Sequence, residues 1–445
     1  MEGATSIADL ATRLKNRQTF SLELIGDLYT EIEASDDKGN IFTALLTGRM
    51  LDAAEASDTR RGKNRTLGPL DGIPIAIKDN LHIAGYETCA GTGYDFSNTF
   101  SETAKVVQQL ENAGAIVIGK CNMDEAALGA STNNKFYGQC DNPRYPGHTP
   151  GGSSGGSAAV VAAGYASASL GTDTMGSVRI PAAYCELWGL KPTQGLVSSI
   201  GLVPLSTQLD TIGPIATCAR DLKLMLAAMT GNPIGGGSTA DNEQNHVIEL
   251  GDLKIGVVNP KELTDTDGLV LSAFEAMLQR LSESGCRFEQ TVIEGWTPGQ
   301  LRRDGLLLCE VEASEAMATP LDQSAASFSK AFHSMMEYGR SANKEKIATS
   351  AARIDTLKAS TLDCFQQYDA LLLPTAPQLA FPVDDEIPAN QADFTALANV
   401  AGSPAISFPI AIPGNSRLAS AQLLAKPGSD FWLVDVAEEL DKLLN

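Results

Sequence analysis

The sequence predicts an α/β protein in which one mixed β-sheet runs through two successive halves of the chain. Short runs rich in Ile and Val alternate with amphipathic helical stretches after residue 68. The chain has 445 residues, of which 43% are hydrophobic, and this is enough for a large buried core. No repeat of fixed period is visible, which argues against a solenoid or a propeller.

Helices are predicted for residues 5–60, because apolar residues recur at three- and four-residue spacing from Ile7 to Leu28. The spacing of apolar residues changes near residue 60, and this divides the chain into two parts. We expect residues 1–60 to form an N-terminal helical region and residues 61–445 to form the main domain.

The first half of the sheet is predicted from apolar runs. Ile73–Ile77 and Ala115–Ile118 are typical of buried strands, and a further strand passes through Leu170. Thr103–Ala113 has helical spacing. Asn232–His246 has no periodicity and is expected to be a surface connection to the second half.

The second α/β half is expected over about residues 250–445. Leu253–Val258 and Arg287–Ile293 are predicted strands on either side of a helix at Gly268–Glu283. Ala370–Pro374 is a further buried strand that ends at a proline, and Asp435–Leu444 is an amphipathic helix.

Charge and cysteine spacing exclude several classes of protein. The chain has 33 Lys and Arg residues and 54 Asp and Glu residues. The resulting net charge of −21 argues against binding to nucleic acid or to anionic lipid. No secretory leader or bilayer-spanning apolar stretch is visible, so we expect a cytoplasmic protein. The eight cysteines show no CxxC spacing, which argues against a zinc site and a dense disulfide framework.

The most unusual composition is TPGGSSGGSAAVVAAG at residues 149–164, whose backbone N–H groups could hold an anion or a developing oxyanion. A flexible linker would not continue into an apolar Ala and Val run. A phosphate loop would end in Gly-Lys-Ser/Thr. A nucleophile elbow centred on Ser154 fits GxSxG, but it needs a downstream histidine, and only His246 and His333 are available.

The second unusual segment covers residues 170–198. We expect a strand that breaks at Gly171, a turn over Asp173–Ser177, and an extended chain that resumes through Arg179 and Pro181. Successive N–H groups in such a turn could hold a tetrahedral oxyanion while the Ser177 hydroxyl attacks. Taken alone, the segment could equally be a structural turn.

Together, these segments resemble the signature region of the amidase-signature family. The resemblance is carried by GGSSGGSAAVVAAG, GTDTMGSVRIPAAYC and GLKPTQG, and by the upstream segments GPLDGIPIAIKDN and GKCNMDEAALGAST. It is clear over about residues 65–215. It implies one large catalytic domain over residues 61–445, with a mixed central sheet covered by helices on both faces.

The resemblance implies that Ser177 is the nucleophile, that Ser153 is a bridging serine on a cis peptide, and that Lys78 is the base. Chemistry supports this independently, because a serine hydroxyl needs a neighbouring base and no histidine is well placed. Lysine can serve when burial lowers its pKa. The alternative for Lys78 is a surface ion pair with Asp79.

The same resemblance implies an acyl-enzyme on Ser177 and requires no metal or organic cofactor. The oxyanion hole would be formed by the backbone N–H groups of four consecutive residues, Thr174, Met175, Gly176 and Ser177.

Three further residues fall on positions that hold such a site together. Ser154 and Asp173 would hydrogen-bond around the triad, and Arg179 would support them. Plain turn capping is the alternative for these residues.

Some positions depart from the family pattern. Met175 replaces a glycine; a positive φ would strain it, and otherwise its side chain reshapes the pocket, which is the outcome we expect. Glu186 and Leu187 replace small residues, and Ala126 replaces an aromatic residue. We expect these three changes to alter the pocket wall.

The predicted function is hydrolysis of a small carboxamide or urea-derived amide to a carboxylate and ammonia or an amine. The resemblance also allows a homodimer. One alternative is the A subunit of a tRNA-dependent amidotransferase, which releases ammonia from glutamine in a complex; Ile180, where that family has Gln, argues against it. The other is a non-catalytic binding protein, which the intact triad disfavours. Arg302, Arg303 and Arg340 are candidates for binding a substrate carboxylate, with surface solvation as the alternative.

Overall fold

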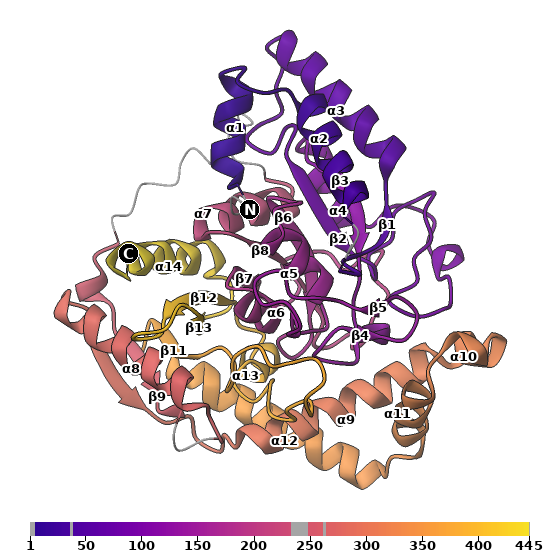
Figure 1. Ribbon diagram of the computed structural model, residues 1–445. Helices are drawn as coiled ribbons and strands as arrows, with labels where there is room; N and C mark the ends of the chain where they lie inside the picture. The colour runs from indigo at the N-terminus through magenta and orange to yellow at the C-terminus, as the bar shows by residue number, and fades with distance from the viewer. Residues whose placement is uncertain (1–4, 36–38, 233–247, 261–263, 445) are drawn as a thin grey trace.

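The computed structural model describes residues 5–35, 39–232, 248–260 and 264–444 (Figure 1). Most of the predicted connection at Asn232–His246 therefore lies outside the described residues. The described strands form an eleven-stranded sheet in the order β1-β3-β2-β6-β8-β7-β12-β13-β11-β9-β10 and a small hairpin, β4-β5. The strands are β1 (Phe42–Leu45), β2 (Pro74–Lys78), β3 (Ile116–Cys121), β4 (Asn133–Asn134), β5 (Gly138–Gln139), β6 (Ala168–Asp173), β7 (Trp188–Lys191), β8 (Thr211–Ala216), β9 (Ile255–Val258), β10 (Phe288–Thr291), β11 (Ala370–Pro374), β12 (Ala405–Ala411) and β13 (Leu418–Ala425).

Parallel and antiparallel pairs are both present in the large sheet. Strands β3, β2 and β6 are mutually parallel, as are β11, β9 and β10. Antiparallel pairs run from β6 through β8, β7, β12 and β13 to β11. The prediction of one mixed sheet shared by both halves is confirmed.

Helices cover both faces of this sheet (Figure 1). They are α1 (Ile7–Lys15), α2 (Ser21–Ala34), α3 (Thr47–Gly62), α4 (Lys105–Asn112), α5 (Gly155–Ala162), α6 (Arg179–Tyr184), α7 (Ala219–Met229), α8 (Gly268–Glu283), α9 (Pro298–Ala316), α10 (Ala318–Gln323), α11 (Lys330–Ser341), α12 (Lys344–Cys364), α13 (Ala396–Val400) and α14 (Asp430–Leu444). Helices α1, α4, α7, α8 and α14 contribute to the core on one face. On the other face, α2, α3, α5 and α6 cover the first half, and α9, α11, α12 and α13 cover the second.

Strand β11 shows how one short sequence serves both faces. Its residues Ala370 and Leu372 enter the core with α8 and α14, whereas Leu371 and Leu373 enter the core with α9 and α12. Successive side chains of a strand point to opposite faces. A continuous apolar run therefore fits a strand that is covered on both sides.

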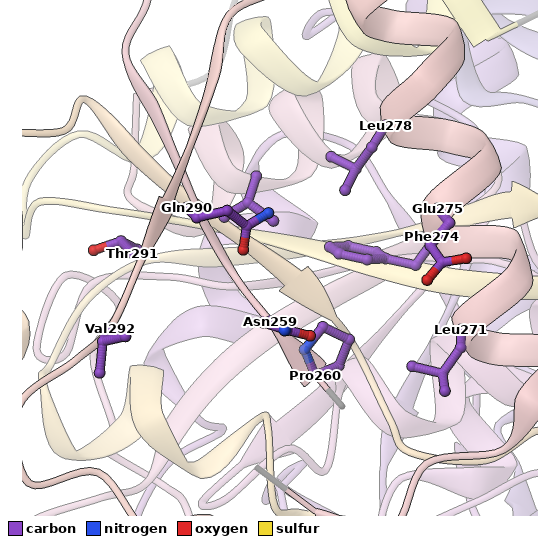
Figure 2. Close-up of a pocket in the computed structure, with 10 residues that line it drawn as sticks. Asn259, Pro260, Leu271, Phe274, Glu275, Leu278, Gln290, Thr291 and Val292 are labelled. Atoms are coloured by element: carbon purple, nitrogen blue, oxygen red, sulfur yellow. The ribbon is translucent and has the colours of Figure 1, made fainter. Parts of the chain in front are cut away.

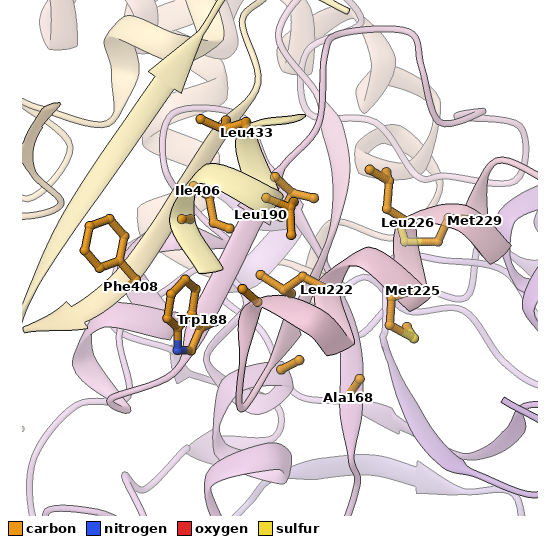
Figure 3. Close-up of a cluster of buried hydrophobic side chains, with 14 of the residues drawn as sticks. Ala168, Trp188, Leu190, Leu222, Met225, Leu226, Met229, Ile406, Phe408 and Leu433 are labelled. Atoms are coloured by element: carbon orange, nitrogen blue, oxygen red, sulfur yellow. The ribbon is translucent and has the colours of Figure 1, made fainter. Parts of the chain in front are cut away.

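The two halves meet where β7 pairs with β12. The rings of Trp188 on β7 and Phe408 on β12 stack with centroids 5.5 Å apart, and Leu433 and Leu222 lie in the same cluster (Figure 3). Apolar burial of this kind is the main favourable contribution to folding. The junction between the halves is therefore part of the core.

Most of the predicted helices and strands are present, but they begin or end at other residues than predicted. Helix α8 and strand β11 have the predicted bounds. The helical prediction for residues 5–60 is wrong at Phe42–Leu45, which forms β1 because it pairs with the edge of β3. The prediction of an extended chain through Arg179 is also wrong. Pro181 lies in the first turn of α6, where a helix needs no N–H from it. The predicted break at Gly171 is absent, and β6 continues to Asp173.

Across the described ranges, no helix combines the length and apolar character needed to cross a bilayer.

Candidate active site

Lys78 is the last residue of β2 and is completely buried. Its strand lies between β3 and β6, so its side chain reaches Thr172 near the end of β6 without crossing solvent. The Nζ atom donates to Ser153 Oγ at 2.8 Å and to Thr172 Oγ1 at 2.8 Å. Two buried hydroxyl groups therefore surround the lysine head.

Burial lowers the pKa of Lys78 from 10.5 to about 7, because the charged form loses its hydration. The carboxylates of Asp124 and Asp210 act in the opposite direction but do not outweigh burial. The alternative of an ion pair with Asp79 is contradicted, because Asp79 contacts Lys120 Nζ at 2.9 Å. Lys78 is thus a lysine that can be neutral near pH 7.

Ser153 precedes α5, and the Gly152–Ser153 peptide bond is cis. Gly152 has no room for a side chain, because a Cβ there would lie 2.0 Å from Asp124 Oδ2. Asp124 also accepts hydrogen bonds from the Ser131 and Thr132 amides. The segment that carries Ser153 is therefore closely packed against the loop after β3.

Ser154 is occupied in a structural contact. Its Oγ donates to the Thr172 carbonyl at 3.1 Å and accepts from the Thr172 amide at 3.2 Å, which ties the start of α5 to β6. His333 lies on α11 with Nε2 2.8 Å from the Ala325 carbonyl oxygen, and His246 lies outside the described residues. The described chain therefore provides no downstream histidine that could act as the base for Ser154 in a nucleophile elbow.

Ser177 lies in the turn directly after β6, half-buried at the wall of a cavity. Gly176 has φ 132°, and a Cβ there would lie 2.2 Å from Thr395 Oγ1, so only glycine fits. The Gly176 amide donates to Asp173 Oδ1 at 2.7 Å and is not free for a substrate oxyanion. The amides of Thr174, Met175 and Ser177 have no protein acceptor among the described residues, so three of the four predicted oxyanion donors are free of a protein partner.

Asp173 and Arg179 form a buried clamp across the turn. Arg179 Nε lies 3.0 Å from Asp173 Oδ2, and Nη2 lies 2.9 Å from Oδ1. Burial opposes the carboxylate charge, but the Arg179 charge and hydrogen bonds outweigh it and lower the Asp173 pKa to about 2.

The second half of the chain completes this clamp. Arg179 donates to Asn399 Oδ1 at 2.7 Å and to Gln422 Oε1 at 2.8 Å, and Asn399 Nδ2 donates to Asp173 Oδ1 at 2.9 Å. All hydrogen-bonding partners of the clamp are thus buried protein groups.

Met175 does not adopt a positive φ, and its side chain lines the cavity, as expected. Its Sδ atom lies against Gly305 of α9, where a Cβ would approach to 2.6 Å. The expectation for the other departures is wrong, because Ala126, Glu186 and Leu187 do not line this cavity. The Glu186 carboxylate instead accepts a hydrogen bond from the Leu418 amide at 2.7 Å.

The cavity beside Ser177 has a volume of about 220 Å³ and mostly apolar walls. Of the three arginines considered above, Arg302 lines it, whereas Arg303 and Arg340 are exposed and do not. A larger cavity of about 450 Å³ lies between β9, β10 and α8, and Figure 2 shows Phe274 and Gln290 on its walls. None of the predicted catalytic residues lines that second cavity.

Two residues of the site were missed from the sequence. Thr172 is the second partner of Lys78, and its position next to Asp173 in GTD was the available signal. Asp210 accepts from Thr174 Oγ1 at 2.6 Å and holds the turn from the side of β8. No local pattern around Asp210 indicates this contact.

The chain is similar in sequence and in fold to several known proteins. The Amidase family profile matches residues 23–434. The glutamyl-tRNA(Gln) amidotransferase of Koribacter versatilis (strain Ellin345) has an A subunit that is 33% identical to this chain, with 98% of each chain covered. A crystal structure of an amidase superposes with a TM-score of 0.89 at 26% identity, covering 99% of this chain and 100% of that one. A chain from the structure of a vestigial protein complex that reveals the evolutionary origins of an s-triazine catabolic enzyme superposes with a TM-score of 0.87 at 28% identity, covering 98% of both chains.

Proposed function

The chain belongs to the amidase family, and we propose that it hydrolyses the C–N bond of a small carboxamide or urea-derived amide through an acyl-enzyme on Ser177. The products are a carboxylate and ammonia or an amine. Membership of the family supports the reaction class, whereas the roles of individual residues are part of the proposal.

One observation carries the proposal: Lys78 is buried against two hydroxyl groups and has no carboxylate of the described chain in contact. A lysine in this environment has a pKa of about 7 and can accept a proton at the operating pH. Ser153 Oγ accepts from Lys78 Nζ, and a serine hydroxyl can also donate a hydrogen bond, so Ser153 can connect this base to a second serine.

The proton moves in a relay. Ser177 Oγ attacks the amide carbonyl carbon while its proton passes to Ser153 Oγ, and the Ser153 proton passes to Lys78 Nζ. The oxyanion is held by the amides of Thr174, Met175 and Ser177. When the C–N bond breaks, the proton returns from Lys78 through Ser153 to the leaving nitrogen. Water then repeats the relay at the acyl-enzyme, and the carboxylate leaves.

A second candidate is the glutamine-hydrolysing A subunit of an amidotransferase. It is favoured by relatives that are A subunits of glutamyl-tRNA(Gln) amidotransferases and that align over nearly the whole chain. Against it stands Ile180, which directly follows the Ser177–Arg179 segment at the position where that type of subunit has Gln.

The test is ammonia release from primary amides, urea derivatives and glutamine, with wild type compared with Ser177→Ala. We expect the substitution to lower the release by at least about 10³-fold. Ser199→Ala, at an exposed serine outside the cavity, is the matched control and should retain activity.

Two other results would decide against the main proposal. Release from glutamine alone, and only after partner proteins are added, would select the amidotransferase. No release from any amide, together with no labelling of Ser177 by a fluorophosphonate probe, would select a binding protein.

A further inference from the structure

We propose that the preferred substrate carries a carboxylate at the end away from its scissile amide, and that Arg302 determines this specificity. This inference rests on the proposed amide hydrolysis and names its substrate class. The observation behind it is an oriented guanidinium, largely shielded from solvent, on the wall of the cavity that contains Ser177.

Arg302 lies on α9, three residues before the glycine against which Met175 packs. Three residues correspond to a rise of about 4.5 Å along a helix. Met175 belongs to the predicted oxyanion turn, and its side chain lies on the cavity wall beside Ser177. The guanidinium is thus placed at the same cavity as the nucleophile, on a different structural element.

The Asp393 carboxylate fixes the orientation of the Arg302 side chain. Its Nε donates to Asp393 Oδ1 at 2.7 Å, and Asp393 is only 2% exposed. Thr264 Oγ1 donates to the other carboxylate oxygen at 2.8 Å. Because both oxygens of Asp393 are engaged, this residue acts as a positioning residue that holds the guanidinium plane.

The two Nη groups of Arg302 have no acceptor among the described residues. Arginine presents these donors in a planar fork that matches the two oxygens of a carboxylate. A substrate carboxylate would complete the hydrogen bonding of the side chain, and a neutral end group would leave it incomplete.

The other residues that line the cavity narrow the class of substrate that fits it. Leu128, Ile180 and Leu306 are among its apolar walls, and no Asp or Glu lines it in the described chain. A substrate ammonium would therefore meet no free carboxylate, which makes a zwitterion such as glutamine a poorer fit. The cavity of about 220 Å³ suits a small amide with an apolar body and one anionic end.

The experiment compares matched pairs that differ in charge: 4-carbamoylbenzoate with 4-methylbenzamide, and the monoamide of glutaric acid with pentanamide. We expect wild type to show a higher kcat/KM for the anionic member of each pair. Arg302→Met should lower the anionic-to-neutral ratio of kcat/KM by roughly 10- to 100-fold, the effect of losing a charge-assisted hydrogen bond. The inference would be overturned if wild type showed equal kcat/KM for the anionic and neutral members of a pair. It would also be overturned if Arg302→Met left the anionic-to-neutral ratio of kcat/KM unchanged.

Two variants control for indirect effects. Arg302→Met alone leaves the Asp393 charge unpaired, and that charge could repel an anion by itself. The double variant Arg302→Met/Asp393→Asn removes it and should show the same loss of selectivity. Arg303→Met removes a neighbouring exposed charge of α9 and should keep the wild-type ratio.

Binding to Ser177→Ala separates this inference from the proposed function. Calorimetric titration with 4-carbamoylbenzoate and 4-methylbenzamide should show tighter binding of the anion, and adding Arg302→Met should remove the difference. Turnover of both pair members with equal efficiency would reject the carboxylate specificity and keep the amidase. Tighter binding of the anion without turnover of any amide would reject the hydrolytic function and keep the anion site.

Discussion

Two neighbouring strands each bury a lysine, and the surroundings of the two lysines differ. On β3, Lys120 contacts the Asp79 carboxylate at 2.9 Å and donates to the Glu87 carbonyl at 2.7 Å. On β2, Lys78 has two hydroxyl partners and no contacting carboxylate among the described residues. Both side chains are completely buried. The two buried lysines therefore differ in their contacts: a carboxylate pairs with Lys120, whereas hydroxyl groups alone contact the Lys78 ammonium in the described chain.

The largest expected effect separates the two lysines by activity. Lys78→Met should lower kcat/KM for any amide substrate by at least about 10³-fold, because the relay loses its proton acceptor. The free energy of unfolding at pH 8 should not fall, since a costly buried amine is replaced by an apolar side chain of similar length. Ammonia release and urea denaturation measure the two quantities. A variant that unfolds more easily would show that Lys78 stabilises the fold as Lys120 does.

Lys120→Met should give the opposite pattern. It leaves the Asp79 carboxylate buried without an opposite charge, so we expect a loss of about 3–5 kcal/mol in the free energy of unfolding. The double variant Lys120→Met/Asp79→Asn removes that unpaired charge and should recover part of the loss. Urea denaturation checks both variants, and equal stability of the single and double variants would contradict the ion-pair explanation.

The pH dependence of activity tests the state of Lys78 directly. Burial lowers its pKa to about 7, so the base is protonated below that pH and neutral above it. We expect kcat/KM to fall about tenfold for each pH unit below 7 and to level off above. A profile that rises only near pH 10 would mean that burial does not depress this pKa.

The smallest effect concerns the second hydroxyl partner. Thr172→Val keeps the shape of the residue but removes one hydrogen bond to Lys78, and we expect kcat to fall by about 3- to 10-fold. Thr211→Val is a matched control on the facing strand β8, because the Thr211 hydroxyl is buried and has no partner in the described chain. Equal losses in both variants would assign the effect to packing.

Residues that are close in sequence to the signature segments could be predicted, and the more distant ones could not. Lys78 and Ser153 are predicted to contact each other, and Lys78 Nζ lies 2.8 Å from Ser153 Oγ. Asn399 and Gln422 reach Arg179 across more than 200 residues, and no local pattern marks a contact of that range.

The fold was predicted to a similar extent. Long apolar runs such as Ala370–Pro374 identify buried strands, because both faces of the sheet are covered. Phe42–Leu45 carries no such signal, since its side chains are only half-buried and its pairing with the sheet edge determines its structure. Met175 was predicted to reshape the cavity, whereas the partner that accommodates it, Gly305, required the tertiary structure.

The contacts of Arg179 also bear on biosynthesis. A ribosome releases the segment with Ser153 and Ser177 long before it adds Asn399 and Gln422. The nascent chain can therefore contain every proposed catalytic residue while the clamp over Asp173 still lacks its amide partners. The clamp that holds the Ser177 turn is therefore complete only after α13 and β13 have been synthesised and have joined the fold.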